Sequence, residues 1–225
     1  MTMPGRVALA WSGGKDSTMT LAKLRTDPHY EVDILVTTVT EDYQRISLHG
    51  VRRELLEAQA QAVGFPLTVV YIPANATDEI YKARMEQTLR PLLADGITTV
   101  AFGDLFLEHV RRYRERWLPT VGITPIFPVW HEDTRRMAEI FLQDGFAAIV
   151  ACVDTTWLNP EFAGRQYDAA FLRDLPAHVD PCGERGEFHT FVYDGPIFHH
   201  RVPVQTGERV QRGGRVFCDL VGGDR

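Results

Sequence analysis

Residues 6–25 have the sequence RVALAWSGGKDSTMTLAKLR, which sets out a strand, a glycine-rich loop and a helix. The apolar run over 6–11 is typical of a buried strand, and residues 17–25 are typical of a helix. Between them lies Ser12-Gly13-Gly14-Lys15-Asp16-Ser17. In this order, backbone N–H groups at a helix start lie at the carboxyl end of the first strand, where they can bind phosphate.

The residue types of this loop suit a bound anion. The two adjacent glycines let the backbone approach closely, the two serines add hydroxyl donors, and Lys15 adds a positive charge, while Asp16 can hold Mg²⁺ against phosphate oxygens. The spacing is neither G-x-x-x-x-G-K-[ST] nor G-x-G-x-x-G. It resembles instead the pyrophosphate-binding loop of the N-type ATP pyrophosphatases, which implies ATP cleaved between its α and β phosphates. A glycine turn with a chance lysine is the alternative, which the flanking strand and helix disfavour.

Beyond this stretch, apolar segments alternate with segments of helical period, the pattern of parallel strands joined by crossover helices. The sequence predicts strands over 6–11, 32–39, 67–72, 98–102, 124–127 and 147–153, and helices over 17–25, 51–63, 77–94, 107–118 and 134–143. The expected fold class is α/β, with an open, mostly parallel sheet.

The alternation stops after about residue 155, where proline and glycine become frequent. We therefore expect an ATP-binding domain over 1–154 and a small C-terminal α+β subdomain over 155–225. Within the subdomain the sequence predicts a helix near 168–175 and strands near 188–193 and 216–220.

Composition excludes several classes of protein. The chain has 225 residues, of which 44% are apolar, enough to fill a core. With 24 Lys and Arg against 30 Asp and Glu, the formal charge of −6 argues against nucleic acid as a partner. The three cysteines argue against a disulfide framework, and no long apolar segment is present. We expect a cytoplasmic protein without a membrane partner.

A second segment, Cys182-Gly183-Glu184-Arg185-Gly186-Glu187-Phe188-His189-Thr190-Phe191, places two carboxylates, an arginine and a histidine between glycines in front of a predicted strand. Polar groups on a loop held by a scaffold often carry function. From the residues alone, an exposed turn with scattered charges is an equal alternative.

Five ordered motifs together resemble the diphthine-ammonia ligase family, also described as ATP-binding, adenine nucleotide alpha hydrolase-like proteins. They are the loop at 12–17, Leu48-His49-Gly50 before a helix ending in Val63-Gly64-Phe65-Pro66-Leu67, Phe102-Gly103-Asp104, Pro-Ile-Phe-Pro-Val-Trp at 125–130, and Gly183-Glu184-x-Gly186-Glu187-Phe188 leading to Asp194-Gly195-Pro196-Ile197-Phe198. The sequence departs from the family at His189, where members often have glutamate, and after Asp104, where the match is loose. These departures lie where an acyl substrate would dock.

The resemblance implies an enzyme that uses ATP to adenylate a carboxylate, releases pyrophosphate, and lets ammonia attack the acyl adenylate to give an amide and AMP. The carboxylate would be that of diphthine on translation elongation factor 2. The implied fold is a Rossmann-like nucleotide-binding domain with a C-terminal subdomain that carries the glutamate–glycine motif.

The candidate site residues form three groups. The rule that ligands of open α/β sheets lie at the carboxyl ends of the strands places the nucleotide near the ends of the first, second and fourth strands, and the resemblance implies the second loop and the substrate side. The catalytic candidates are Lys15, Asp16, Glu184 and Glu187. The nucleotide-binding candidates are Ser12, Gly13, Gly14, Lys15, Asp16, Ser17, Thr38, Val39, His49, Gly103 and Asp104. The substrate candidates are Tyr113, Arg114, Arg185 and His189. A local hydrogen bond for His49 and a solvated helix face around Tyr113 are the alternatives.

Other functions share this kind of loop. One is an ATP pyrophosphatase that acts on another small molecule or on tRNA, including a sulfurtransferase in which Cys182 would be the reactive thiol. The other is a module that binds a nucleotide without catalysis. Formation of AMP and pyrophosphate separates an enzyme from such a module.

Overall fold

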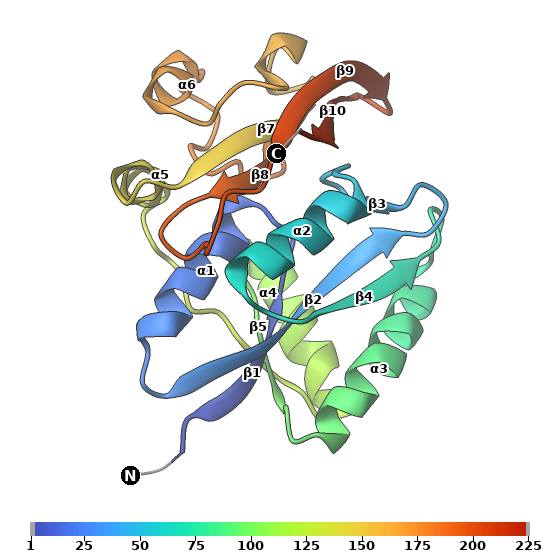
Figure 1. Cartoon of the computed structure of the whole chain (residues 1–225). Helices are drawn as coiled ribbons and strands as arrows, with labels where there is room; N and C mark the ends of the chain where they lie inside the picture. Colours follow the sequence, from blue (N-terminus) through green and yellow to red (C-terminus); the bar gives the residue numbers. More distant parts are fainter. Residues whose placement is uncertain (1–2, 224–225) are drawn as a thin grey trace.

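The protein consists of a mostly parallel sheet with helices on both faces and a smaller antiparallel sheet packed above it (Figure 1). The structure is a computed structural model that describes residues 3–223. The strands of the first sheet are β1 (Gly5–Ala10), β2 (Tyr30–Thr40), β3 (Arg45–Ile46), β4 (Leu67–Ile72), β5 (Thr99–Ala101) and β6 (Thr124–Ile126). The helices between them are α1 (Lys15–Thr26), α2 (Arg53–Val63), α3 (Asp78–Ala94), α4 (Glu108–Trp117) and the 3-10 helix η1 (Leu118–Val121).

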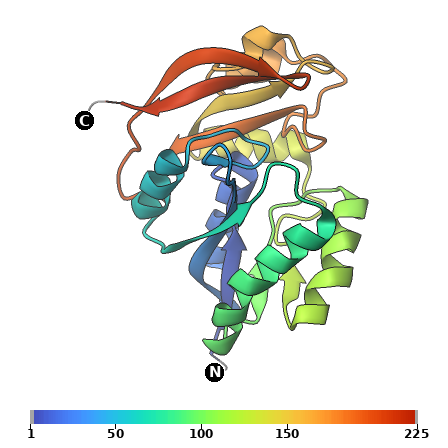
Figure 2. The same cartoon turned by 90° about the vertical axis from the view of Figure 1, so that its right-hand side faces the viewer.

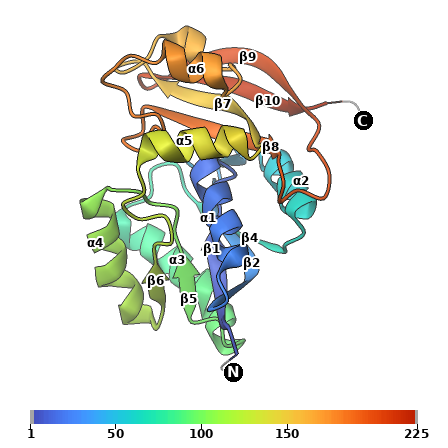
Figure 3. The same cartoon turned by 90° about the vertical axis from the view of Figure 1, so that its left-hand side faces the viewer.

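Strand alternation sends neighbouring residues into two separate cores. Leu9 of β1 belongs to the buried cluster that contains Leu21 of α1 and Leu56 of α2. Ala8, the residue before it, belongs to the cluster that contains Leu89 of α3. Figure 3 shows the sheet edge-on, with α1 and α2 on one face and α3 and α4 on the other. This confirms the expected α/β fold class.

The order of the parallel strands, β4-β2-β1-β5-β6, reverses direction at β1. The chain moves outward from β1 to β2 and β4, then returns to the other side of β1 to form β5 and β6. The carboxyl ends of β1 and β5 therefore form a topological switch point, where ligands of open α/β sheets bind.

The short strand β3 borders this point. Residues 30–36 of β2 pair with β1, and residues 35–40 pair with β4 on the opposite edge. Because β3 pairs antiparallel with residues 39–40, it occupies the edge of β2 that β1 leaves free after Ala10. The segment around β3 thus forms one wall of the space above the loop at 12–17.

The second sheet has the order β8-β7-β10-β9 and is antiparallel throughout. Its strands are β7 (Ala147–Asp154), β8 (Phe188–Asp194), β9 (Val204–Arg212) and β10 (Arg215–Gly222). The helix α5 (Thr134–Gln143) precedes β7, and the 3-10 helix η2 (Pro160–Phe162) and α6 (Ala169–Asp174) lie between β7 and β8 in the chain. A two-residue turn, Gly213-Gly214, joins β9 to β10 with positive φ at both positions. That conformation suits the right-handed twist of a hairpin.

Residues 147–153 were expected among the parallel strands, and this assignment is wrong. The segment forms β7, which pairs antiparallel with β8 and β10. Nearly all of β7 is buried, a pattern that usually marks a parallel strand. Here β7 is buried because its side chains belong to the same buried cluster as residues of the first sheet and of α1 and α2. The segment 155–181 adds further buried side chains to this cluster, such as Phe171. The division at residue 154 stays a prediction.

The other predicted helices and strands are present, with ends within a few residues of those expected. The sequence did not predict β3, which has two residues, or β9, whose side chains are mostly exposed. No helix within residues 3–223 is both long and apolar enough to cross a bilayer.

Candidate active site

A cavity of about 510 Å³ opens at the switch point, between the carboxyl ends of the parallel strands and the second sheet. This volume lies within the range of small-molecule sites, roughly 300–1,000 Å³. Of the predicted site residues, those lining the cavity are Ser12, Gly14, Lys15, Asp16, Ser17, Thr38, His49, Gly103, Asp104, Arg114, Glu184 and His189. Gly13, Val39, Tyr113, Arg185 and Glu187 are not in its lining.

The loop at 12–17 is held from behind by Gln59 of α2, which is fully buried. Its Nε2 donates to the carbonyl of Gly13 at 2.9 Å and to the carbonyl of Val192, and its Oε1 accepts from Nε1 of Trp11 at 2.7 Å. A side chain at position 13 would lie 2.6 Å from this Oε1, at a φ of +74°. Glycine at position 13 therefore serves the packing behind the loop, with the cavity on its other side.

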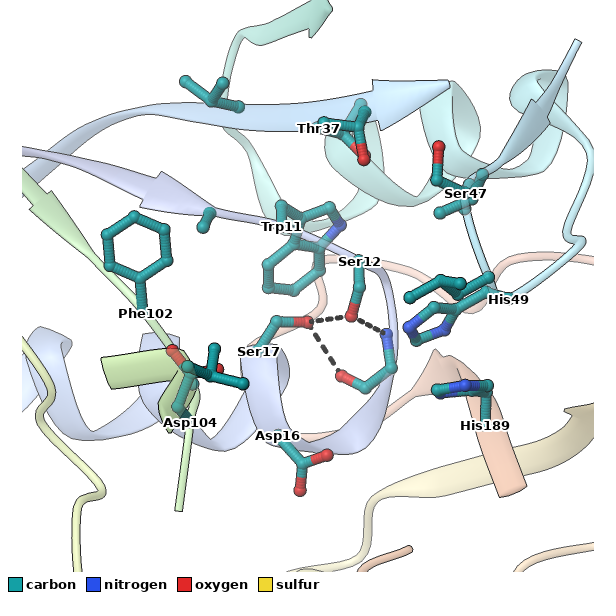
Figure 4. Close-up of a pocket in the computed structure, with 18 of the residues that line it drawn as sticks. Trp11, Ser12, Asp16, Ser17, Thr37, Ser47, His49, Phe102, Asp104 and His189 are labelled. Carbon is teal, nitrogen blue, oxygen red and sulfur yellow. Dashed lines mark hydrogen bonds between the residues drawn. The ribbon is translucent and has the colours of Figure 1, made fainter. Parts of the chain in front are cut away.

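The start of α1 is joined to the second sheet. The amide N–H of Lys15 donates to Oγ1 of Thr190 at 3.0 Å, and the amide of Val192 donates to the carbonyl of Gly13 at 2.9 Å. Gly14 is the N-cap residue of α1, and as a glycine it makes no side-chain hydrogen bond to the first turn of the helix. On the cavity side, Ser12 and Ser17 place their hydroxyl oxygens 3.3 Å apart (Figure 4). The loop thus presents the hydroxyls of Ser12 and Ser17 to the cavity, while the amides of Gly14 and Lys15 are bonded to Ser12 and Thr190.

The Lys15 side chain is buried and bridges two elements. Its ammonium donates to both carboxylate oxygens of Asp16 at 2.9 Å and to the carbonyl of Cys182. Burial lowers the pKa of Lys15, but the charges of Asp16 and other neighbours outweigh burial and raise the pKa above its ordinary value. Burial raises the pKa of Asp16, although Lys15 opposes this, and Asp180 and Asp104 raise it further.

At the other end of the cavity, strand β2 contributes Thr37 and Thr38. Thr37 is 2% exposed, and its Oγ1 has no hydrogen-bond partner among residues 3–223. Such an atom is costly to bury unless a ligand or water binds it. Val100 and Phe102 add apolar walls, whereas Val39 is fully buried in the sheet. Thr37, which sequence reasoning missed, lines the cavity, whereas the predicted Val39 does not.

Asp104 and Arg114 form an ion pair in the lining of the cavity. Nε of Arg114 donates to Oδ2 of Asp104 at 2.8 Å, and its guanidinium carbon lies 4.0 Å from the ring centroid of Phe102. Tyr113 lies outside the lining, and its hydroxyl donates to Asp78 on α3. Of the two substrate candidates on α4, Arg114 therefore reaches the cavity.

The two glutamates of the second segment have different surroundings. Oε1 of Glu184 accepts from the amides of Leu105 at 2.7 Å and Phe106 at 3.3 Å. Burial, and then the charge of Asp16, raise the pKa of Glu184 to about 7, against the effect of these amides. Glu184 lines the cavity and combines this raised pKa with a fixed position.

Glu187 is fully buried and lies away from the cavity. Its Oε1 accepts from the amide of Asp180 at 3.1 Å and its Oε2 from the amide of Arg185 at 2.8 Å. Arg185 lies 3.5 Å from the same carboxylate, with half of its side chain exposed. We therefore propose that Glu187 holds the loop 180–187 in shape and that Arg185 neutralises the charge of the Glu187 carboxylate.

Two histidines face each other at the side of the cavity. The rings of His49 and His189 have centroids 4.3 Å apart, inclined by 32° (Figure 4). Burial lowers the pKa of His49 to about 4 and, together with His49, lowers that of His189 well below its ordinary value. Nη1 of Arg215 lies 3.2 Å from Nε2 of His189, and because a guanidinium only donates, this nitrogen accepts. Nδ1 of His49 has no partner among the described residues.

Fold and geometry together define a class: an α/β protein in which a glycine-rich loop at a helix start and a partly buried carboxyl group of raised pKa line one switch-point cavity. Comparison with known families refines it. The chain matches the diphthamide synthase N-terminal domain over residues 5–125 and the diphthamide synthase C-terminal domain over residues 133–223. The chain therefore belongs to the diphthamide synthase family.

Its relatives are distant in sequence but similar in extent. The diphthine–ammonia ligase of Rattus norvegicus is 26% identical over 247 residues, which cover 96% of this chain and 88% of the relative. That of Bos taurus is 23% identical over 241 residues, with the same coverage. A solved structure of the U34-tRNA thiolase NcsA from Methanococcus maripaludis, with its 4Fe-4S cluster, superimposes with a TM-score of 0.40 at 14% identity, over 63% of this chain and 58% of that chain.

Proposed function

We propose that this chain is an ATP-dependent ligase that activates a carboxylate as its adenylate and transfers the acyl group to ammonia. One observation carries the proposal: the loop at 12–17 and Glu184, which come from different parts of the chain, line the same cavity. By likeness to the relatives named diphthine–ammonia ligase, the carboxylate that accepts AMP, called the acceptor below, is that of diphthine. We take this diphthine to be the one on elongation factor 2, as the resemblance of the sequence implies.

The cavity fits a nucleotide in size and polarity. Its apolar end, with Val100 and Phe102, suits a purine, and Oγ1 of Thr37 can bond a polar edge of the base. Nδ1 of His49 is a second buried polar atom without a partner among residues 3–223. ATP would satisfy both atoms, which supports it as the co-substrate.

The phosphates would lie at the loop. The hydroxyls of Ser12 and Ser17 and the amides of Asp16 and Ser17 in the first turn of α1 can donate to phosphate oxygens, and the helix dipole favours the negative charge. Lys15 holds the Asp16 carboxylate in place at this point. The acidic neighbours that raise the pKa of Asp16 make a further cation favourable there.

Mg²⁺ would be held by Asp16 together with phosphate oxygens, since this ion is usually bound through one or two carboxylates plus the substrate. When bound, it neutralises charge on the departing pyrophosphate. Residues 3–223 contain no cluster of three or more ligating side chains, so the ion would arrive with the nucleotide.

Glu184 suits the amide-forming step. The carboxylate oxygen of the acceptor attacks the α-phosphorus, and pyrophosphate leaves. Ammonia then attacks the acyl carbon, AMP leaves, and the new nitrogen loses a proton that the Glu184 carboxylate accepts. A pKa of about 7 places Glu184 near the optimum for a general base at neutral pH.

Sulfur transfer is the competing function, and the surroundings of Cys182 disfavour it. Its thiol is buried and donates to the carbonyl of Thr134 at 3.3 Å. Burial raises the pKa of the thiol, which leaves little of the reactive thiolate.

The proposal is tested by incubating the protein with ATP, Mg²⁺, ammonium and diphthine-bearing elongation factor 2. We expect AMP and pyrophosphate in equal amounts, together with conversion of the carboxylate to an amide. ADP and phosphate as products would contradict the proposal, and a nucleotide-binding module would release neither pair.

A further inference from the structure

A second depression, of about 360 Å³, lies beside the cavity described above. One wall is the segment 40–50 around β3, and the other is the β9–β10 ribbon, which passes over that segment (Figures 1 and 2). We call this depression the ribbon groove. Ile46 and Leu48 line both the ribbon groove and the cavity, so the two spaces share a wall.

The ribbon groove gathers exposed apolar side chains. Five large apolar residues are exposed within residues 3–223, and three of them, Tyr43, Leu48 and Val210, line this groove. Beside Val210, its cross-strand neighbour Phe217 completes the apolar floor. Exposed apolar side chains scattered singly are ordinary, but their concentration in one groove indicates a binding surface.

Two backbone features hold this wall in place. Leu48, which is 68% exposed, has a φ of +67°, a left-handed conformation that is strained for a bulky side chain. At Gly50, an added Cβ would lie 2.4 Å from the ring of Phe217, so the segment approaches the ribbon more closely than other residues allow. The fold thus holds an apolar side chain out between the cavity and the groove.

The charge of the ribbon groove favours a polypeptide. Arg45 and Arg52 both bind Asp219, at 2.9 and 2.8 Å, so that carboxylate is neutralised. The charged residues in the lining of the groove are two arginines, Arg45 and Arg212, and two carboxylates, Glu208 and Asp219. This balance lacks the excess of positive charge that a nucleic-acid backbone requires.

Strand β9 adds a means of binding an extended chain. It is the edge of the second sheet and pairs with β10 alone among the described strands. Glu208, Val210 and Arg212 alternate along it and face the groove. An edge strand leaves N–H and C=O groups to which an extended segment can add, and such a segment would lie along the free edge of β9, which borders the groove.

We propose that the ribbon groove docks the polypeptide segment that bears the acceptor carboxylate. The modified side chain passes Leu48 into the cavity, while neighbouring residues of the segment cover Val210 and Tyr43. This inference rests on the proposed function, because it takes the acceptor to be carried by a protein.

The test compares Val210→Glu and Tyr43→Ser, on opposite walls of the groove, with Ile80→Glu. Ile80 is 41% exposed on α3 and lines neither space, so it is a matched control. Dissociation constants are measured for diphthine-bearing elongation factor 2 in the presence of an ATP analogue that cannot be cleaved between its α and β phosphates. They are measured separately for the analogue alone.

We expect each groove variant to weaken binding of elongation factor 2 by about tenfold, since a charge or a lost aromatic contact falls within an apolar interface. Binding of the ATP analogue and thermal unfolding should stay at wild-type values, and Ile80→Glu should change nothing. Equal binding by all variants, or no binding by the wild type, overturns the docking proposal.

Amide formation separates this result from the proposed function. If the groove variants weaken docking but the wild type forms no AMP with elongation factor 2 and ammonium, the ligase assignment fails while the docking site stands. If the wild type adenylates a free small carboxylate and does not bind elongation factor 2, the docking site fails while ligase chemistry stands.

Discussion

The amide of Lys15 donates a hydrogen bond to Oγ1 of Thr190 at 3.0 Å, across 175 residues of sequence. Through this bond the first turn of α1 is attached to β8 of the second sheet. Both residues are buried, at 3% and 2% exposure. The loop at the end of β1 is therefore positioned by the second sheet, and both parts of the chain line one cavity.

Thr190→Val keeps the shape of the side chain but removes this acceptor. Because a buried N–H is left without its partner, we expect a loss of roughly 1–3 kcal/mol in the free energy of unfolding. Weaker ATP binding should accompany it, measured by calorimetry. Thr206→Val, at an exposed position on β9, is the control and should change neither quantity. Equal effects of the two substitutions would contradict a role for this bond.

Gln59→Leu tests the support behind the loop. The substitution leaves Nε1 of Trp11 without an acceptor and removes one of the two donors to the carbonyl of Gly13, which keeps the amide of Val192. We therefore expect a destabilisation on the order of 1–3 kcal/mol. ATP affinity should also fall, since the loop loses its fixed position. Gln61→Leu, an exposed change on the same helix, should preserve both. Normal ATP binding in Gln59→Leu would show that the loop holds its conformation unaided.

Lys15→Met keeps much of the aliphatic stem and removes the charge. If the ammonium orders Asp16 and the phosphates, AMP formation should fall by roughly 10²–10³-fold, the cost of losing one electrostatic contact in a transition state. The structure adds that Lys15 also bonds the Cys182 carbonyl, so some stability should be lost as well. Lys23→Met, at a half-exposed site on α1, is the control. Unchanged turnover in Lys15→Met would remove the assignment.

The raised pKa of Glu184 predicts two pH effects. The folded pKa of about 7 lies above the ordinary value of 4.5, so the folded protein binds more protons than the unfolded chain between these values. Stability should therefore fall as pH rises from about 4.5 to about 7, and Glu184→Gln should flatten this slope. Unfolding by urea at several pH values measures it.

The same group should control the rate. As a base, Glu184 is active when ionised, so amide formation should rise with pH through about 7 and level off above it. Glu184→Gln keeps an oxygen for the amides of Leu105 and Phe106 but should lose this rise and most of the activity. A wild-type profile that is flat between pH 6 and 8 would exclude the role.

The local pattern of the sequence was sufficient for the alternation of strands and helices in the first sheet and for the position of the loop at 12–17, because both depend on neighbouring residues. It was not sufficient for β7, whose apolar run is compatible with either sheet, or for β9, where nine mostly exposed residues carry no burial signal. Pairing partners are set by contacts far apart in the chain.

The same limit applies to the site. Gln59 and Thr190 appear in sequence as an ordinary helix glutamine and an ordinary strand threonine, and their roles follow from distant contacts. Glu184 and Glu187 are three positions apart in a single motif, and sequence reasoning could not separate them. Burial does so, because the structure directs one into the cavity and surrounds the other with backbone amides.

The central claim is that the carboxylate is activated by attack of its oxygen on the α-phosphorus of ATP. Isotope transfer tests this claim most directly. Elongation factor 2 with ¹⁸O in the diphthine carboxylate is incubated with the protein, ATP, Mg²⁺ and ammonium, and the AMP is analysed by mass spectrometry. We predict one ¹⁸O atom in AMP for each amide formed. AMP that carries oxygen only from water, or ADP in its place, would contradict the claim.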